Sequence, residues 1–307
     1  MYDAIIIGGG PAGLAAAVYA ARQKISFIVL AKNIGGQTAI SADIENYLGF
    51  THTSGAELSK KFEGHVAANK AEIKEGEEAV SLQKIAHGFK VTTNAGVYET
   101  AAILIASGKK PRRLNIPGEN EYYGKGLTYC ATCEAPLYGD KDVAVIGGGN
   151  SAMDAALLAE KYSRTVYLIT VNPELMGEAA MQELIKKSGK VTVLTNARTT
   201  EVFGDNFVKG IKVDVGGTAR ILNVTGVFVE VGSIPSVDFD RLTEKNKYSE
   251  IEIHSEGMMT NMASVPGIFA AGDVTDIPEK QISVAAGEGV KAILSIFQYL
   301  RKGTVTY

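Results

Sequence analysis

The sequence predicts an α/β fold with two parallel-sheet domains, the second inserted into the first. Two observations carry this prediction. An apolar run that ends in a glycine-rich turn occurs at residues 4–13, and the same plan recurs at 143–152. A further glycine-rich segment at 267–273 precedes a long stretch with apolar residues at helical spacing. Continuous apolar strands are typical of a parallel sheet that helices cover on both faces.

The N-terminal segment contains the first strand–helix–strand unit. Residues 4–7 predict a buried strand, the alanine-rich stretch 14–22 predicts a helix, and residues 25–30 predict a second strand. This order is that of a βαβ unit, in which both strands run parallel in one sheet.

The turn of this unit has the spacing of a dinucleotide-binding fingerprint. Gly8 would permit the tight turn, Gly10 would let a pyrophosphate approach, and Gly13 would let the helix pack on the strand. The acid that usually binds ribose about 20 residues further on is missing, because the chain reads Leu30-Ala31-Lys32 there. Ribose must therefore be held in another way.

The second unit repeats the order strand, turn, helix and strand at 143–146, 147–152, 153–160 and 166–169. Gly147, Gly149 and Ala152 take the three fingerprint positions of its turn. Two such units far apart in the chain are not a short solenoid repeat. They indicate two Rossmann-like nucleotide-binding domains.

The remaining segments indicate how the two domains are connected. Residues 101–106 predict another buried strand, and the polar stretch 109–113 that follows predicts a linker. The glycine-rich segment 267–273 and a helix at 284–300 would return to the first domain. The second domain is therefore predicted to interrupt the first.

Composition excludes several classes of partner. The net charge is −3 and no basic stretch is long, so no nucleic-acid partner is expected. No apolar span of 20 residues occurs, so no membrane segment is expected. The N-terminus starts a strand without a charged prelude, unlike a signal peptide, and two cysteines are too few for a stapled secreted fold. We expect a cytoplasmic protein.

Cys130-Ala131-Thr132-Cys133 is the main chemical signal. Two cysteines at this spacing can close a small disulfide ring, and the motif can lower the thiolate pKa of one partner. A zinc site would need two more ligands, but no other cysteine exists and the four histidines form no ligand-spaced pair, so no metal is predicted. Two inert thiols are the alternative. Glu134 follows directly, either as a proton shuttle for disulfide cleavage or as a solvated surface glutamate.

The pair Gly272-Asp273 lies at the end of an apolar strand and before a predicted helix. An aspartate in this place suits a hydrogen bond to a ribityl hydroxyl of a flavin. In isolation it would more often be a helix N-cap that satisfies free backbone donors, and the two roles are compatible.

Taken together, these residues resemble the low-molecular-weight thioredoxin reductases over essentially the whole chain. The markers are 8–13, Gly35-Gly36-Gln37, 43–47, 129–133, 147–152, 267–274 and Gln281. The chain is also similar to the reductase core of the alkyl hydroperoxide reductase flavoprotein subunit, at 44–47, 196–202 and 287–289. The N-terminal thioredoxin-like domains of that subunit do not occur in this sequence, so a separate dithiol partner is expected.

The resemblance implies FAD in a discontinuous domain, residues 1–112 and 245–307. By matching positions, the flavin contacts would be Gly8, Gly10, Gly13, Gly36, Gln37, Asn46, Asp273 and Gln281. The inserted domain, 113–244, would carry the dithiol and a pyridine-nucleotide site with Gly147, Gly149 and Ala152.

The resemblance also implies a mechanism and an assembly. A donor passes a hydride to FAD, reduced FAD opens the Cys130–Cys133 disulfide, and the inserted domain presents the dithiol to an oxidised thioredoxin-like or glutaredoxin-like protein. Cys130 would attack the partner, with Cys133 nearer the flavin. Glu134 stands where the family usually has aspartate, and a homodimer is the family expectation.

One departure from the family concerns the electron donor. Members that use NADPH carry a histidine and two arginines after the second strand of the inserted domain, where this chain has Thr170, Val171 and Asn172. Each lost charge-assisted contact to the 2′-phosphate costs on the order of 1.5–3 kcal/mol, or roughly tenfold or more in affinity. We therefore predict NADH rather than NADPH. Thr170 is not an acid for the ribose hydroxyls, and Glu174 could serve only if its loop folds back.

Three alternatives stay open. The donor could be reduced ferredoxin or a deazaflavin coenzyme, as in relatives without the basic cluster. The protein could be a flavin dithiol oxidase that passes electrons to oxygen. It could also be a flavin-binding redox sensor in which the dithiol only switches conformation.

Overall fold

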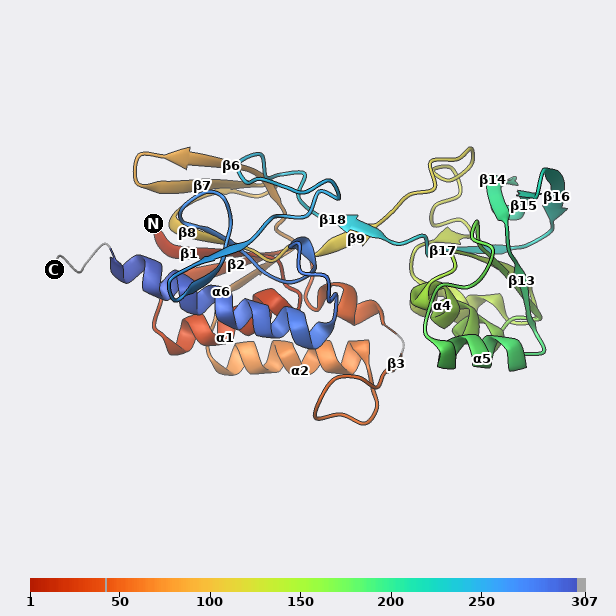
Figure 1. The fold of residues 1–307 in the computed structure, drawn as a ribbon, viewed down its shortest axis with the longest axis horizontal. Helices are drawn as coiled ribbons and strands as arrows, with labels where there is room; N and C mark the ends of the chain where they lie inside the picture. Colours follow the sequence, from red (N-terminus) through yellow and green to blue (C-terminus); the bar gives the residue numbers. More distant parts are fainter. Residues whose placement is uncertain (42, 303–307) are drawn as a thin grey trace. The chain divides into compact units, whose positions relative to one another are not determined.

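The computed structural model describes residues 1–41 and 43–302 and divides into two compact units (Figure 1). Unit 1 comprises Met1–Lys110 and Ile234–Tyr307, and unit 2 comprises Pro111–Ser233. Unit 2 is thus inserted in the chain of unit 1. Each unit is built on a sheet with parallel central strands, which confirms the predicted α/β fold class.

The main sheet of unit 1 has nine strands. Its path runs in the order β19 (His254–Glu256), β20 (Met259–Met262), β21 (Ile268–Ala270), β8 (Val97–Ile105), β1 (Tyr2–Ile7), β2 (Phe27–Ala31) and β5 (Ile73–Glu75). Strands β6 (Ala79–Ile85) and β7 (Gly88–Thr93) extend antiparallel from β8. Strand β1 pairs in parallel with both β2 and β8, as the predicted strand–helix–strand order requires.

Helices and short elements complete unit 1. The helices are α1 (Pro11–Arg22), α2 (Gly55–Ala68) and α6 (Ile282–Lys302). The short elements are the 3-10 turns η1 (Gly36–Ile40) and η3 (Gly272–Val274) and the two-stranded pair β3 (Asp43–Ile44) and β4 (Thr53–Ser54). Figure 1 shows α1, α2 and α6 together along one face of the sheet.

Strand β1 explains why a continuous apolar run marks this sheet. Ala4 and Ile6 belong to the core beneath α1 and α6, whereas Ile5 and Ile7 belong to the core on the opposite face. Successive side chains of a strand point to opposite faces, so a strand covered on both sides must be apolar at every position. All four side chains are at most 4% exposed.

Unit 2 contains a five-stranded parallel sheet. Its order is β10 (Leu127–Thr128), β17 (Gly226–Val229), β11 (Asp142–Ile146), β12 (Thr165–Ile169) and β13 (Val191–Leu194). The helical elements are α3 (Ala131–Glu134), η2 (Ala135–Tyr138), α4 (Asn150–Glu160) and α5 (Ala179–Lys187). An antiparallel sheet of β14 (Ala197–Gly204), β15 (Val208–Val215) and β16 (Thr218–Leu222) covers the other face.

Strand β11 repeats the burial pattern of β1. Val143 and Val145 pack in the core with α4, whereas Ala144 and Ile146 pack in the core with β14 and β15. The same alternation therefore organises both units.

The structure moves several predicted boundaries. The helices α1 and α4 begin at Pro11 and Asn150, three residues before the predicted starts, because the turn residues themselves enter the first helical turn. Proline suits that position, since its missing N–H would have no partner there. The stretch 109–113 is not wholly a linker: Lys109–Pro111 forms β9, which pairs with β18 (Ser233–Pro235). Its polar composition concealed this strand.

Candidate redox site

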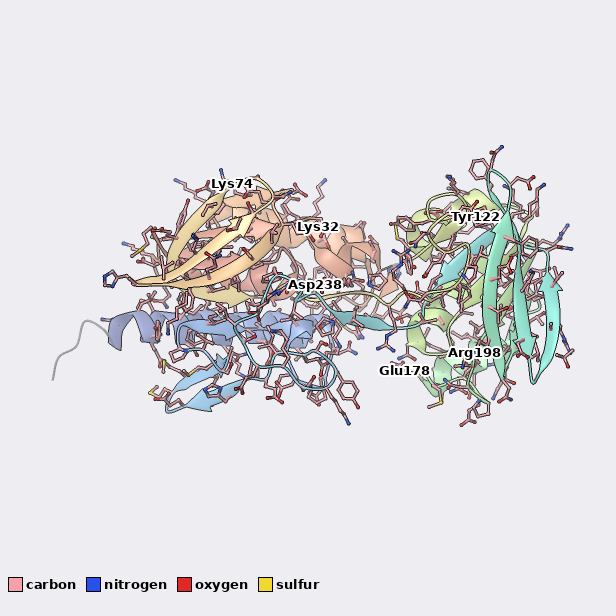
Figure 2. All side chains as sticks on the ribbon, turned by 90° about the horizontal axis from the view of Figure 1, so that it is seen from above. Lys32, Lys74, Tyr122, Glu178, Arg198 and Asp238 are labelled. Carbon is pink, nitrogen blue, oxygen red and sulfur yellow. A yellow bond between two sulfur atoms is a disulfide. The ribbon has the colours of Figure 1, made fainter. Side chains whose placement is uncertain are left out.

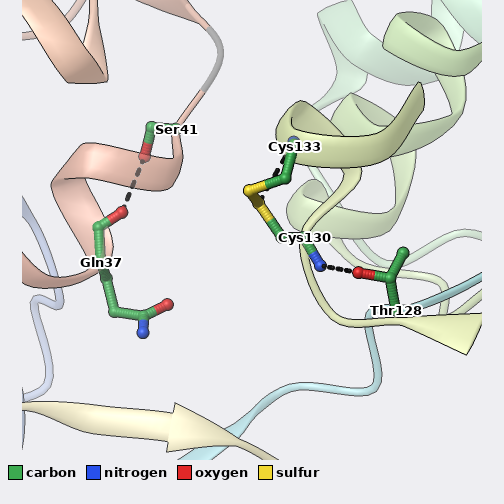
Figure 3. Close-up of a disulfide and its surroundings, with 5 residues drawn as sticks. All are labelled: Gln37, Ser41, Thr128, Cys130 and Cys133. Carbon is green, nitrogen blue, oxygen red and sulfur yellow. Dashed lines mark hydrogen bonds between the residues drawn. A yellow bond between two sulfur atoms is a disulfide. The ribbon is translucent and has the colours of Figure 1, made fainter. Parts of the chain in front are cut away.

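The two cysteines of unit 2 form a disulfide (Figure 3). Their Cα atoms are 5.3 Å apart, and they lie directly after β10, at the carboxyl end of the parallel sheet. The Cys130 N–H donates to Thr128 Oγ1 at 3.1 Å, and the Cys133 N–H donates to Cys130 Sγ at 3.2 Å. Cys133 is exposed and Cys130 is half-buried. The predicted disulfide therefore forms, and the backbone N–H groups of both cysteines donate hydrogen bonds next to it.

Glu134 ends the short helix α3 and is half-buried. Burial and the negative charge of Glu134 raise the pKa of Tyr138 to about 12. The tyrosine ring packs edge-on against Phe228. Glu134 thus lies beside the disulfide, and its role as a proton shuttle stays a prediction. Among the described residues no group of three or more His, Cys, Asp and Glu side chains could hold a metal.

The first glycine turn joins β1 to α1 in unit 1. Gly8 has φ +125°, and a Cβ atom there would lie 2.1 Å from the Ala106 carbonyl oxygen. A Cβ atom at Gly13 would lie 1.9 Å from the Gly8 carbonyl oxygen. A Cβ atom at Gly10 would meet nothing within 4 Å. Packing therefore requires glycine at Gly8 and Gly13, whereas Gly10 leaves a space open at the start of helix α1.

Gly35 and Gly36 lie against this turn. The Gly35 N–H donates to the Gly9 carbonyl at 2.8 Å, and a Cβ atom at Gly36 would lie 3.3 Å from the Gly10 Cα atom. Both have positive φ, +89° and +55°, which glycine adopts without strain. Gln37, the next residue in η1, is exposed. The structure thus brings one predicted flavin contact, Gly36, to the glycine turn, with Gln37 next to it in the chain.

Two further predicted contacts meet each other across 235 residues of sequence. The Asn46 Nδ2 donates to Gln281 Oε1 at 3.2 Å. Both side chains are exposed, and Gln281 immediately precedes α6. The pairing shows that residues predicted separately belong to one surface of unit 1.

Asp273 lies inside the 3-10 turn η3, directly after β21. The alternative that Asp273 caps a helix is wrong, because Ala271 is the cap of η3 and α6 begins only at Ile282. Burial raises the pKa of Asp273, and the charges of Lys280 and Lys109 offset part of this rise. In the described part of the chain its carboxylate has no hydrogen bond. A half-buried carboxylate of this kind calls for a hydrogen-bond donor.

The second glycine turn, in unit 2, has the same backbone requirement. Gly147 has φ +146°, and a Cβ atom there would lie 2.2 Å from the Glu230 carbonyl oxygen. A Cβ atom at Gly149 would meet nothing within 4 Å. Ala152, fully buried in α4, replaces the third glycine. The open position is thus preserved in both units.

The end of β12 contains no cation. Thr170 is buried, with its hydroxyl accepting from the Asn172 N–H at 3.2 Å, and Val171 is 57% exposed. The loop after β12 does fold back on the turn, since the Met176 N–H donates to the Gly148 carbonyl at 2.7 Å.

The acid that the folded-back loop brings to the turn is Glu178 rather than Glu174. The Glu178 N–H donates to Asn150 Oδ1 at 2.7 Å, and Asn150 Nδ2 donates to the Glu178 carboxylate at 3.4 Å. Figure 2 labels Glu178 and Arg198 in unit 2. A pocket of about 260 Å³ beside Val171 is lined by Arg198 and Asp214 as its charged residues. One cation and one anion leave this pocket without a net charge.

Comparison with known proteins agrees with this geometry. The model of the pyridine nucleotide-disulphide oxidoreductase family matches residues 2–289. The chain belongs to this family. An alkyl hydroperoxide reductase subunit of Staphylococcus epidermidis is 38% identical over 303 residues, which cover 97% of this chain and 59% of that protein. The Staphylococcus aureus counterpart is 39% identical with the same coverage. This chain therefore spans only about 59% of the length of these relatives.

The match to solved thioredoxin reductase structures extends over nearly the full length of both chains. The T. acidophilum thioredoxin reductase is 39% identical with a TM-score of 0.89, covering 97% of this chain and 98% of that one. The Lactococcus lactis thioredoxin reductase is 30% identical with a TM-score of 0.92, covering 98% and 100%. The predicted resemblance to both groups is confirmed. Proteins of the family use FAD with a pyridine nucleotide.

The residues of unit 1 fit FAD. The open position at Gly10 lies at the N-terminus of α1, where the N–H groups of Ala12 and Gly13 have no partner within the helix. Such a terminus attracts a pyrophosphate. Asp273 has a carboxylate that lacks a hydrogen bond in the described part of the chain, and it suits a hydroxyl donor.

The sequence analysis did not identify two acids, Glu288 and Glu230, as site residues. Glu288, buried in α6, accepts from the Gly272 N–H at 3.3 Å and from Thr275 Oγ1 at 3.4 Å, and so supports the turn that carries Asp273. Glu230 follows β17 beside Gly147, and burial together with the charge of Asp154 raises its pKa to about 7. The available signals were an acid within an apolar helix and an acid directly after a buried strand.

No helix among the described residues combines the length and the apolar character needed to cross a bilayer. The cellular location and the homodimer stay predictions.

Proposed function

We propose that this chain is a flavin-dependent disulfide reductase that delivers electrons through Cys130 and Cys133 to an oxidised thioredoxin-like or glutaredoxin-like protein. The observation that carries the proposal is the disulfide at the carboxyl end of a parallel sheet in a chain whose other unit fits FAD. FAD, when bound, supplies the two-electron chemistry that joins a hydride donor to a disulfide. The proposed outer domain is 1–112 with 245–307 and the proposed inserted domain is 113–244, while the compact unit 1 also includes 234–244.

The cysteines then carry the electrons onward. Two electrons and two protons break the Cys130–Cys133 bond and give two thiols. The Cys130 thiolate attacks the partner disulfide, forms a mixed disulfide and releases one partner thiolate. Cys133 attacks the Cys130 sulfur, which restores the internal disulfide and frees the second partner thiol.

The choice of Cys130 as nucleophile is supported by its hydrogen bond. Exposure alone would favour Cys133, but the thiolate and not the thiol is the nucleophile. A backbone N–H that donates to sulfur favours the charged form, and the Cys133 N–H points at Cys130 Sγ. Glu134, next in sequence, is the proposed proton relay.

Single serine variants test this assignment. We expect C133S to retain FAD, to lose turnover and to trap a mixed disulfide with a thioredoxin-like partner, which mass spectrometry would detect. C130S should retain FAD and trap none. Turnover of a thioredoxin-like protein by C133S would overturn the role of the pair, and trapping by C130S instead would reverse the two cysteines.

For the electron donor we propose NADH. The turn at Gly147, Gly149 and Ala152 keeps its open position, and the loop after β12 contains acids but no lysine or arginine before Lys186. Arg198 is matched by Asp214 in the neighbouring pocket. A phosphate dianion therefore has no surplus of positive charge there, whereas the neutral ribose hydroxyls of NADH need none.

Anaerobic stopped-flow reduction of the bound FAD tests the donor. NADH should bleach the flavin faster than NADPH, and V171R with N172R should raise NADPH affinity about tenfold or more by adding charge-assisted contacts. Failure of both nucleotides together with rapid reduction by ferredoxin or a reduced deazaflavin would replace this proposal by the non-pyridine alternative.

The likeness to the staphylococcal alkyl hydroperoxide reductase subunits favours a second candidate, delivery of electrons toward alkyl hydroperoxide reduction. The two candidates differ only in the acceptor. Steady-state NADH oxidation with a thioredoxin-like protein and with a peroxide-reducing thiol protein, compared at equal concentration, separates them. Rapid peroxide formation from oxygen with a small dithiol alone would favour the dithiol oxidase.

A further inference from the structure

The buried carboxylate of Glu119 is hydrogen-bonded to the residue that precedes Cys130. Glu119 is 2% exposed. Its Oε1 accepts from the Leu114 N–H at 2.7 Å and from the Tyr129 hydroxyl, and its Oε2 accepts from the Asn115 N–H at 2.7 Å. The Arg113 Nε is 3.8 Å from Oε2. Both carboxylate oxygens are therefore satisfied by donors, as a buried carboxylate requires.

Tyr129 connects this carboxylate to the redox pair, because it directly precedes Cys130. Its ring lies 5.8 Å from the ring of Tyr123. Burial, the hydrogen bond to Glu119 and the charge of Glu119 raise the pKa of Tyr129 to about 12, so its hydroxyl stays a donor at neutral pH. The other donors to the Glu119 carboxylate, the N–H groups of Leu114 and Asn115, belong to the segment by which the chain enters unit 2.

We propose that Glu119 and Tyr129 are positioning residues for Cys130: their hydrogen bond fixes the residue before the nucleophile to the entry segment of unit 2. The inference rests on the proposed role of the Cys130–Cys133 pair. While the disulfide is closed, the ring itself restrains both sulfurs. After reduction, the restraints on Cys130 from the N-terminal side are the Glu119–Tyr129 bond and the Cys130 N–H to Thr128 Oγ1.

A held Cys130 keeps the two thiols close together and thereby favours re-closure of the disulfide. Loss of the hydrogen bond should therefore make the internal disulfide less stable relative to the dithiol. The exchange with glutathione measures this: two glutathione thiols are oxidised to one glutathione disulfide as the Cys130–Cys133 bond opens into two thiols. Neither the donor nor the protein partner takes part in that equilibrium.

The experiment uses the FAD-loaded protein, equilibrated anaerobically in glutathione redox buffers, with free thiols trapped by alkylation and counted by mass spectrometry. We expect Y129F to lower the equilibrium constant for disulfide formation about threefold to tenfold, and a tenfold change corresponds to about 30 mV. Y122F is the matched control, because Tyr122 (labelled in Figure 2) is also a tyrosine of unit 2. Its hydroxyl donates to the Gly204 carbonyl at 2.8 Å rather than to Glu119.

E119Q tests the other partner of the bond. Glutamine has one acceptor oxygen, so at least one backbone N–H group loses its partner, and the Tyr129 hydroxyl loses its acceptor where the amide nitrogen takes the Oε1 position. Because both variants act on the same Glu119–Tyr129 hydrogen bond, the double variant should shift the equilibrium no further than the larger single shift. If E119Q does not fold, Y129F against Y122F decides alone.

A Y129F constant equal to that of the unmodified protein would overturn the proposal, and so would an equal shift in Y122F. If Cys130 and Cys133 were not a redox-active pair, the result would be different: the number of free thiols in the unmodified protein would not change across the buffer series. That result would contradict the proposed function itself.

Discussion

The glycine turns of the two units share a backbone and differ in their surroundings. Gly8 and Gly147 both have positive φ and both lie against a carbonyl of the neighbouring strand, at Ala106 and Glu230. In unit 1 that neighbour is a small apolar residue, whereas in unit 2 it is a half-buried acid.

The helix-closing position shows a second difference. Gly13 leaves no room for a methyl group, while unit 2 holds Ala152 in the same place. Further glycines lie against the first turn: a Cβ atom at Gly289 of α6 would lie 1.9 Å from the Ala12 carbonyl oxygen. At the helix-closing position the first turn is thus the more tightly enclosed. This difference suits a cofactor that stays bound in unit 1 and a substrate that leaves unit 2.

The largest effect is expected from G13A. The new methyl group would meet the Gly8 carbonyl oxygen, which is backbone and cannot move away cheaply, so we expect a loss of about 3 kcal/mol or more in the stability of unit 1. FAD content after purification, from the ratio of flavin to protein absorbance, should fall sharply. Normal FAD content and an unchanged denaturation midpoint would contradict the tight closure of this turn.

The two glycine turns could be predicted from the sequence because the conformation of a turn depends mainly on its own residues. Glycine spacing after an apolar run reports a positive φ at Gly8 and the close approach of Gly13 to the Gly8 carbonyl, both decided within a few residues. The apolar runs likewise predicted strands β1 and β11. The cysteine pair could be predicted because a four-residue ring needs no distant partner.

The rest depended on contacts between distant segments. Asn46 and Gln281 lie far apart in the sequence, and only the fold pairs them. The buried environment of Glu230 comes from the packing of neighbouring elements, so the sequence alone did not mark Glu230 as a site residue. Strand β9 was missed because its polar residues pair with β18, more than a hundred positions away.

The acid beside the second turn predicts that the stability of the protein depends on pH. Glu230 has a pKa of about 7 in the folded protein, above the ordinary 4.5, so the folded state keeps a proton that the unfolded state loses. Stability should therefore fall as the pH rises from about 4.5 to about 7, and the penalty should be complete above 7.

E230Q removes this penalty. We expect it to be more stable than the unmodified protein at pH 8, by on the order of 1–3 kcal/mol, and nearly equal at pH 4. Guanidinium denaturation at both pH values measures the difference. E174Q, at an exposed site in the loop after β12, is the control and should change neither value. A gain for E230Q that is equal at pH 4 and pH 8 would point to packing rather than charge.

Substitutions at the open positions Gly10 and Gly149 should change ligand affinity rather than the stability of the fold. G10A and G149A each add a methyl group where nothing lies within 4 Å, so both proteins should fold with little change in melting temperature. A bound pyrophosphate would meet the methyl group. G10A should weaken FAD binding about tenfold or more. G149A should weaken NADH binding and leave the FAD content unchanged.

Gly64 provides the control for these two variants. It lies in α2 with open space around it, and G64A should stabilise the helix by about 0.5–1 kcal/mol without affecting either ligand. Fluorescence titration measures both affinities. Weakened FAD in G149A, or weakened NADH in G10A with FAD still saturating, would break the assignment of one ligand to each turn.

The smallest effect is expected from A152G, which gives the second turn the residue of the first. No clash is removed, because the alanine already fits, and glycine adds backbone freedom to the unfolded chain. The cost should be about 0.5–1 kcal/mol, with FAD content unchanged and NADH affinity within a factor of about two. Thermal unfolding followed by circular dichroism is the measurement. A loss as large as that of G13A would mean that unit 2 depends on its helix-closing methyl group as strictly as unit 1 depends on having none, and the contrast between an enclosed and an open turn would not hold.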